Sequence, residues 1–160
     1  MPATFTPTLT ADLYPAATAR ILYADTDQMG IVYHASFFRY LELARINLLR
    51  SAGVSYTEFE RAGLGLPLIE VGVRFASPGL YDDLITIHAG LSRITRVRVS
   101  VQYRVMVEAG DRDGTTEPVE ILTAETRHCC VALADTKPAR IPEIAYERLA
   151  KHRSAATPGG

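Results

Sequence analysis

The chain has 160 residues, 48% of them hydrophobic, and a formal net charge of −1 at pH 7. A chain of this length can form one domain whose core needs neither disulfides nor metals. The near-neutral charge disfavours nucleic-acid binding, which requires clustered Lys and Arg. Because no apolar run approaches a membrane span and no secretory leader is recognisable, we expect a soluble cytoplasmic protein without stable membrane insertion.

The two ends of the chain lack hydrophobic periodicity. Residues 1–17 are rich in Thr, Ala and Pro, and residues 153–160 are also mostly small. These features predict a flexible N-terminal tail over 1–17, one domain over 18–152 and a flexible C-terminal tail over 153–160.

The domain is predicted to begin with a short strand over 18–24, followed by a long helix over 35–52. Apolar residues spaced by three or four form one stripe along this helix, namely Phe37, Leu41, Ala44, Leu48 and Ala52. Gly53 is typical of a helix C-terminus. Ser55-Tyr56-Thr57-Glu58 has the pattern of a capping box, which predicts a second, short helix that ends at Gly63.

From residue 66 the apolar period changes to two, which predicts strands. We expect them from 66 to the break at Ser77-Pro78-Gly79, and then over 85–91, 97–107 and 119–133. The arginine-rich side of the 97–107 strand should be solvated, 108–118 should be a polar loop, and a short helix is expected near 143–151.

The short links between consecutive strands make the sheet antiparallel. The predicted fold class is therefore α+β, with an antiparallel five-stranded sheet wrapped around one long central helix. One helix covers only part of five strands, so we expect a homodimer or homotetramer.

Residues 23–34 link the first strand to the long helix and contain Asp25, Asp27, Gly30 and His34. A helix start has unpaired N–H groups and the positive end of the helix dipole. It is suited to polarising a carbonyl or holding an oxyanion. Asp also favours turns and caps, and we favour that simpler interpretation for Asp25.

Two alternatives use these carboxylates to bind a metal. In an EF-hand alignment Met29 and Ser36 occupy the fifth and twelfth positions, where they cannot supply the required oxygens. A transition-metal site would use Asp25, Asp27, His34 and Glu42, but their spacing matches no recognised ligand pattern. We therefore expect no metal and no other cofactor.

Two motifs carry a resemblance to a known family: Tyr23-x-Asp25-Thr26-Asp27-x-x-Gly30-x-Val32-Tyr33-His34 and Tyr40-x-Glu42-x-Ala44-Arg45. The chain resembles the 4-hydroxybenzoyl-CoA thioesterase and YbgC-like branch of the hotdog-fold thioesterases. The resemblance extends over roughly residues 18–150 and includes Lys137-Pro138-Ala139-Arg140-Ile141-Pro142. The N-terminal tail and the 108–118 loop are longer than this family needs.

The resemblance implies hydrolysis of acyl-CoA thioesters without a cofactor, at a site shared across a homodimer interface. It makes Asp27 the catalytic carboxylate, as nucleophile or as general base. It places the backbone N–H of His34 on the thioester carbonyl and the His34 side chain near the site. Tyr33 and Gly30 are the expected substrate-binding residues.

The remaining candidates have simpler explanations. Glu42 and Arg45 are three residues apart on a helix, so a surface ion pair accounts for them. His88 and His128 lie in predicted strands without a recognisable acid–base partner, and Cys129 with Cys130 lacks an activating base. For the CoA phosphates, the available cations are Arg93, Arg96, Lys137 and Arg140.

Two other functions remain open on the same fold. A dehydratase or hydratase of 3-hydroxyacyl thioesters would use His34 together with Asp27. A binding module for acyl-CoA or acyl-carrier protein would need neither residue for catalysis.

Overall fold

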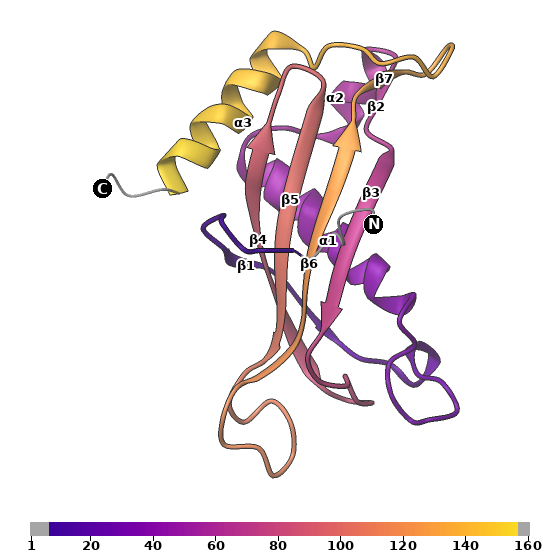
Figure 1. Cartoon of the computed structure of the whole chain (residues 1–160), viewed down its shortest axis with the longest axis vertical. Coiled ribbons are helices and arrows are strands. Elements are labelled where there is room, and N and C mark those ends of the chain that lie inside the picture. Colours follow the sequence, from indigo (N-terminus) through magenta and orange to yellow (C-terminus); the bar gives the residue numbers. More distant parts are fainter. Residues whose placement is uncertain (1–6, 157–160) are drawn as a thin grey trace, which may run out of the picture.

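The computed structural model describes residues 7–156, with side chains described to residue 153. Five antiparallel strands form one sheet in the order β1-β4-β5-β6-β3, and the long helix α1 crosses one face of it (Figure 1). The strands of this sheet are β1 (Tyr14–Arg20), β3 (Leu68–Phe75), β4 (Leu84–Ile94), β5 (Arg98–Val107) and β6 (Val119–Cys129). This confirms the expected five-stranded antiparallel sheet with one long helix.

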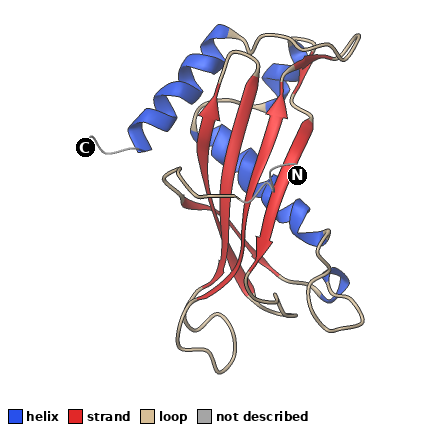
Figure 2. Cartoon of the chain, viewed as in Figure 1, coloured by secondary structure: helices blue, strands red, loops and turns tan. Residues whose placement is uncertain are grey.

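The other elements lie around this frame (Figure 2). The helices are η1 (Tyr23–Asp25), α1 (Ser36–Ser51), α2 (Tyr56–Arg61) and α3 (Glu143–Ala156), and a small two-stranded ribbon pairs β2 (Leu64–Gly65) with β7 (Val131–Ala132). Within the described part of the chain, no helix has the length and apolar character needed to cross a membrane.

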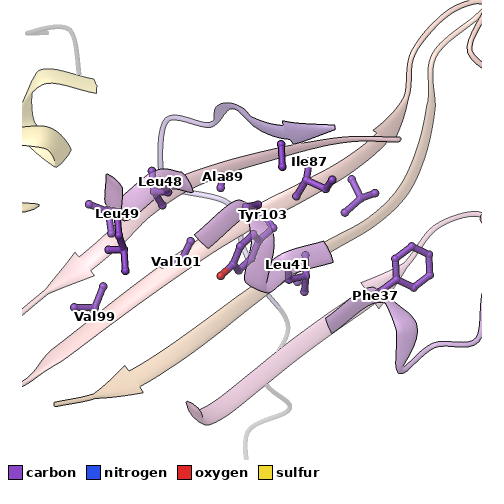
Figure 3. Packing of buried hydrophobic residues seen from close by; sticks show 14 of the residues in the cluster. Phe37, Leu41, Leu48, Leu49, Ile87, Ala89, Val99, Val101 and Tyr103 are labelled. Atoms are coloured by element: carbon purple, nitrogen blue, oxygen red, sulfur yellow. The ribbon is translucent and has the colours of Figure 1, made fainter. Parts of the chain in front are cut away.

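The core lies between α1 and the inner face of the sheet. The helix buries the predicted stripe of Phe37, Leu41, Ala44 and Leu48. Figure 3 shows Phe37, Leu41 and Leu48 of this stripe among the side chains of the strands, with Tyr103 beside Leu41. Tyr103 lies in register with Ala89 of β4 and Ala124 of β6, so two small residues leave room for its ring. The helix packs against β1 and β4 and crosses the sheet obliquely, so that Phe37 at its start also contacts Phe75 of β3 (Figure 1).

The capping box predicted for the short helix is present. The backbone N–H of Glu58 donates to the Ser55 hydroxyl oxygen, and the Glu58 carboxylate accepts the backbone N–H of Ser55. Val54 before this cap and Phe59 after it are both 1% exposed, as a hydrophobic staple requires. Local sequence is therefore sufficient to start α2.

The N-terminal boundary differs from the prediction. β1 begins at Tyr14, four residues before the expected strand, so residues 14–17 are paired with β4 rather than lying in a tail. Upstream, the Gln102 side chain accepts the N–H groups of Thr10 and Ala11 and donates to the carbonyl of Thr8. Residues 1–6 of the predicted tail lie outside the described residues.

This N-terminal segment also explains an error about the outer face of β5. We expected that face to be solvated, yet Ser100 and Gln102 are buried. Gln102 pairs with Glu125 as well as with the segment above it, so its amide is satisfied without water. Gly90 allows the close approach, because an added Cβ there would lie 2.2 Å from the carbonyl oxygen of Asp12.

The C-terminal boundary is also different. α3 extends to Ala156, so residues 153–156 belong to a helix and not to the predicted tail. Ile141, Ala145 and Leu149 are buried at this end of the chain, and their burial holds α3 on the domain. The predicted last strand over 119–133 is two elements, since β6 ends at Cys129 and β7 belongs to the small ribbon. Residues 157–160 lie outside the described part.

The edge strand β3 is less buried than its alternating pattern suggested. Four of its apolar residues are between 36% and 51% exposed: Leu68, Ile69, Val71 and Phe75. α1 contacts this strand where the rings of Phe37 and Phe75 lie 5.9 Å apart, but it does not bury these four side chains. The chain by itself therefore leaves an apolar sheet edge open to contact.

His128 is a buried structural residue, as expected. Its ring nitrogens contact the Leu66 carbonyl and the Thr126 hydroxyl, and Thr126 in turn bonds the Tyr103 hydroxyl. Burial, with a smaller contribution from the charge of Arg45, lowers the pKa of His128 to about 4. The ring is therefore neutral at pH 7 and belongs to a polar network beneath α1.

Candidate active site

The Asp27 loop lies between η1 and α1, at the lower right of Figure 1. It is a tight hairpin: the Asp27 N–H donates to the Ile31 carbonyl at 2.9 Å, and the Gly30 N–H returns to the Asp27 carbonyl at 3.0 Å. Gly30 has φ +72°, a conformation that glycine adopts without steric cost. The Tyr33 N–H closes the base of the hairpin by donating to the Asp25 carbonyl at 2.8 Å.

Asp27 and His34 line one pocket. The carboxylate of Asp27 is half-buried, and its Oδ1 accepts the Met29 N–H at 2.8 Å, which fixes the side chain on its own turn. The pocket has a volume of about 640 Å³, and the other side chains around it are mostly apolar, namely Met29, Ile31, Val32, Phe37, Phe75, Ala76, Ser77, Pro78 and Gly79. A carboxylate thus borders an apolar hollow large enough for an organic group.

The helix α1 begins at this pocket without a side-chain cap. Its N-cap residue is Ala35, which has no oxygen to accept an N–H of the first turn. Among residues 7–156, the backbone N–H groups of His34 and Ala35 find no acceptor. Such groups at a helix start carry partial positive charge and can hold a carbonyl oxygen or an oxyanion. A carboxylate and a helix start with unused hydrogen-bond donors therefore border the same pocket.

Asp25 connects the base of this loop to α1. It is 2% exposed, and it accepts the Leu22 N–H, the Tyr40 hydroxyl and the Arg39 guanidinium. Burial opposes ionisation, but the hydrogen bonds from Tyr40 and Leu22 and the charge of Arg39 outweigh it and lower the pKa of Asp25. Burial of the phenol, together with the same carboxylate, raises the pKa of Tyr40. Asp25 is thus an ionised anchor between the loop and α1.

A family model described as the thioesterase-like superfamily matches residues 21–149, which contain the whole of this site. The chain belongs to the thioesterase-like superfamily. It is therefore a thioesterase by family, and the expected family is confirmed.

Individual relatives agree with this assignment. The thioesterase is 30% identical over 122 residues to a 1,4-dihydroxy-2-naphthoyl-CoA hydrolase of Thermosynechococcus vestitus, covering 76% of this chain and 78% of that protein. It is 25% identical to the acyl-CoA thioesterase YbgC of Haemophilus influenzae, covering 78% and 85% of the two chains. The solved DHNA-CoA thioesterase of Staphylococcus aureus superposes with a TM-score of 0.75 over 89% of this chain and 95% of its own, at 20% identity, which shows the shared fold.

Of the four site residues expected from the sequence of the thioesterase, the structure brings two together. Asp27 and His34 line the pocket, whereas Gly30 and Tyr33 do not. Gly30 shapes the turn, and Tyr33 packs its ring against that of His34 at 4.4 Å between centroids. Tyr33 is 47% exposed, so in this chain its ring faces outward beside the pocket.

The far wall of the pocket was missed by sequence reasoning. It consists of Phe75 and residues 76–79, which follow β3 and lie more than forty residues from Asp27 along the chain. The sequence signal was present, because Ser77-Pro78-Gly79 was recognised as a strand break. Its position opposite the Asp27 loop depends on the tertiary structure: the Val32 N–H donates to the Gly79 carbonyl at 2.9 Å.

The other candidates are engaged elsewhere. Arg45 lies over the Tyr56 ring at 5.2 Å, and the charge of Glu42 acts on it without a direct ion pair within 4.0 Å. Two of the proposed phosphate ligands already hold carboxylates, since Arg96 pairs with Glu143 and Lys137 with Asp135.

His88 has a partner that the sequence did not reveal, the carboxylate of Glu108, 4.0 Å from its Nε2 atom. Across the described residues, no three His, Cys, Asp or Glu side chains are grouped so that they could hold a metal ion. Asp25, a member of the metal set considered from sequence, is instead committed to Tyr40 and Arg39.

Proposed function

We propose that this thioesterase hydrolyses acyl-CoA thioesters, with Asp27 as nucleophile or general base and the backbone N–H of His34 on the thioester carbonyl. One observation carries the proposal: a carboxylate and an uncapped helix start border the same apolar pocket. The relatives named above act on CoA esters, and the approach of a carboxylate to a polarised carbonyl is the chemistry that hydrolysis needs.

The geometry supports a division of roles. The N–H groups at the start of α1 stabilise the negative charge that develops on the carbonyl oxygen. As general base, Asp27 takes a proton from water while the water oxygen attacks the carbonyl carbon, and the proton then passes to the departing CoA sulfur. As nucleophile, Asp27 attacks the carbonyl carbon, the C–S bond breaks and CoA leaves as a thiolate. Water then hydrolyses the acyl anhydride, which regenerates the Asp27 carboxylate and supplies the proton that CoA takes up. Both routes end with a free acid and CoA.

The lining predicts the character of the acyl group. Besides the carboxylate of Asp27 and the imidazole of His34, the hydroxyl of Ser77 is the one polar side chain among the residues around the pocket. An apolar acyl group gives up no hydrogen bonds on entering, whereas a polar substituent exchanges its hydration for few polar partners. We therefore propose that the acyl groups with apolar tails are the preferred substrates.

The test is release of free thiol from a panel of acyl-CoAs, followed with a thiol dye. We expect turnover that is fastest for apolar acyl groups. Hydration or dehydration of a 3-hydroxyacyl-CoA without thiol release would instead identify the enzyme as a hydratase or dehydratase. Tight binding of acyl-CoA with no reaction of either kind would make the protein a binding module, and the proposed function would be wrong.

We also propose that the active unit is a homo-oligomer built on β3. This strand pairs with β6 on one side only, and its apolar residues are exposed. Phe38 and Leu43 on α1 add exposed apolar side chains, at 39% and 40%. An open apolar sheet edge is avoided in monomers, and a second copy of the same edge can cover it.

Val71→Lys should convert the oligomer to a monomer, because a lysine on an edge strand opposes pairing between chains. Light scattering should give a multiple of 17.5 kDa for the parent and 17.5 kDa for the variant. Thr18→Lys on the opposite edge strand β1 is the matched control, since Thr18 is exposed, and it should keep the parental mass. A parent that is monomeric at micromolar concentration would contradict this proposal.

A further inference from the structure

The loop over 108–118 is tied to the turn that follows β3. Both lie at the same end of the sheet, below the strands in Figure 1. Arg112, on this loop, donates two hydrogen bonds to Asp83: Nε to Oδ1 at 2.8 Å and Nη2 to Oδ2 at 2.6 Å. Nη2 also donates to the carbonyl of Pro78 at 3.0 Å. A second contact joins the same segments, from the Leu84 N–H to the Asp111 carbonyl at 3.3 Å.

Asp83 is the centre of this arrangement. It is 2% exposed, and besides Arg112 it accepts the Leu80 N–H at 2.7 Å. A buried carboxylate needs a cation and hydrogen bonds to remain in the fold. The neighbouring cation, Arg20, is directed at Asp82 on the exposed side of the turn. Arg112 is therefore the cation that satisfies Asp83 and, through it, shapes residues 78–83.

The same turn forms a wall of the proposed acyl pocket. Pro78 and Gly79 line the pocket directly. Leu80 forms an isolated antiparallel β-bridge with Ile31, and the Gly79 carbonyl accepts the Val32 N–H. The turn therefore also packs against the Asp27 hairpin. Arg112 donates to the Pro78 carbonyl and does not itself line the pocket. Through this bond Arg112 is attached to the wall of the pocket.

We propose that Arg112 is a positioning residue that holds the 78–83 wall and thereby determines which acyl groups the pocket admits. The inference rests on the proposed function, since it takes the pocket as the acyl site. It also assigns a role to the 108–118 loop, which the core of the fold does not require. Arg112 does not contact the reacting atoms. It acts through Asp83 and Pro78.

The contacts of Arg112 with Asp83 and Pro78 form a clamp on the turn. The Asp27 hairpin should keep its shape when this clamp is removed. It is closed by its own bonds, from Asp27 to Ile31 and from Tyr33 to Asp25. Loss of Arg112 therefore moves the wall while the carboxylate stays in place. The effect should appear in KM for acyl groups long enough to touch the wall, with kcat for a very short acyl group unchanged.

The experiment compares Arg112→Ala and Arg112→Lys with the parent on acyl-CoAs of graded length, from acetyl-CoA upward. In Arg112→Ala we expect KM for the longer acyl groups to rise about tenfold, with acetyl-CoA turnover at the parental rate. Arg112→Lys should rescue only in part, because an ammonium cannot hold both carboxylate oxygens in a planar fork. Arg104→Ala is the matched control: it removes an exposed ion pair with Glu120, 3.2 Å away, and should behave as the parent.

A second variant and a second measurement separate the possible outcomes. If Arg112→Ala does not fold, Arg112→Met/Asp83→Asn removes the clamp without leaving a buried unpaired charge. Amide hydrogen exchange at Leu80 should be faster in every clamp variant. An equal loss of activity at all acyl lengths, or unchanged exchange at Leu80, would overturn the proposal. A parent that hydrolyses no acyl-CoA would refute the proposed function, while the exchange at Leu80 would still decide on the clamp.

Discussion

Asp27→Asn should fold like the parent and hydrolyse acyl-CoA at least about 10³-fold more slowly. The amide keeps the shape of the side chain, and its oxygen can still accept the Met29 N–H that orients Asp27. It loses the negative charge, so it can neither attack a carbonyl carbon nor take a proton from water. The defect should lie in kcat, because the apolar pocket that binds the acyl group is unchanged.

Steady-state thiol release measures this effect, and the melting temperature confirms that the fold is intact. Asp113→Asn is the matched control, because Asp113 is an exposed acid on the 108–118 loop and has no role in the proposed chemistry. It should keep parental activity. Parental turnover by Asp27→Asn would remove Asp27 from the mechanism and leave the helix start as the site's main catalytic feature.

Asp25→Ala should lower the free energy of unfolding by about 3 kcal/mol, or roughly 10 °C in melting temperature. The substitution leaves three donors without their acceptor: the Leu22 N–H, the Tyr40 hydroxyl and the Arg39 guanidinium. It also weakens the base of the Asp27 hairpin, so activity should fall together with stability. Thermal and urea unfolding measure the first effect.

Tyr40→Phe should give a smaller effect, because it removes one of the three donors. We expect it to lower the free energy of unfolding by about 1 kcal/mol. In the Asp25→Ala background, Tyr40→Phe should cost less than it does alone, since the bond is already gone. A loss below about 0.5 kcal/mol for Asp25→Ala would show that the buried carboxylate does not anchor the loop.

The same anchor makes stability depend on pH. The pKa of Asp25 in the fold is lower than its ordinary value of 3.8. Its contribution to stability is therefore fully present above pH 3.8 and is lost as pH falls through the lower folded value. Asp25→Asn should accordingly be less stable than the parent at pH 7, and the difference should shrink in strong acid.

Local patterns were sufficient for most elements of the fold. The stripe from Phe37 to Leu48 identified α1, and the Ser55 capping box identified α2, because both depend on residues a few positions apart. The alternation of β5 placed its apolar side against α1 for the same reason. The Asp27 hairpin is also local, so its two key residues could be singled out before the fold was known.

The errors arose where distant segments meet. Gln102 is buried because residues 8–11 cross β5, and β3 is exposed because α1 does not cover its apolar side chains. Neither fact has a signature within the strand concerned. Periodicity identifies which side of a strand is apolar, but burial depends on what is packed against that side.

For the site, the sequence by itself determined the carboxylate, the helix start and their spacing, since seven residues of one hairpin connect Asp27 to His34. The tertiary structure decided the rest. It set Phe75 and the 76–79 turn opposite the hairpin, and it gave Asp25 its partners on α1. It also brought Arg112 to Asp83 across 29 residues of chain. These contacts depend on strand pairing and packing, which bring together residues that no local pattern relates.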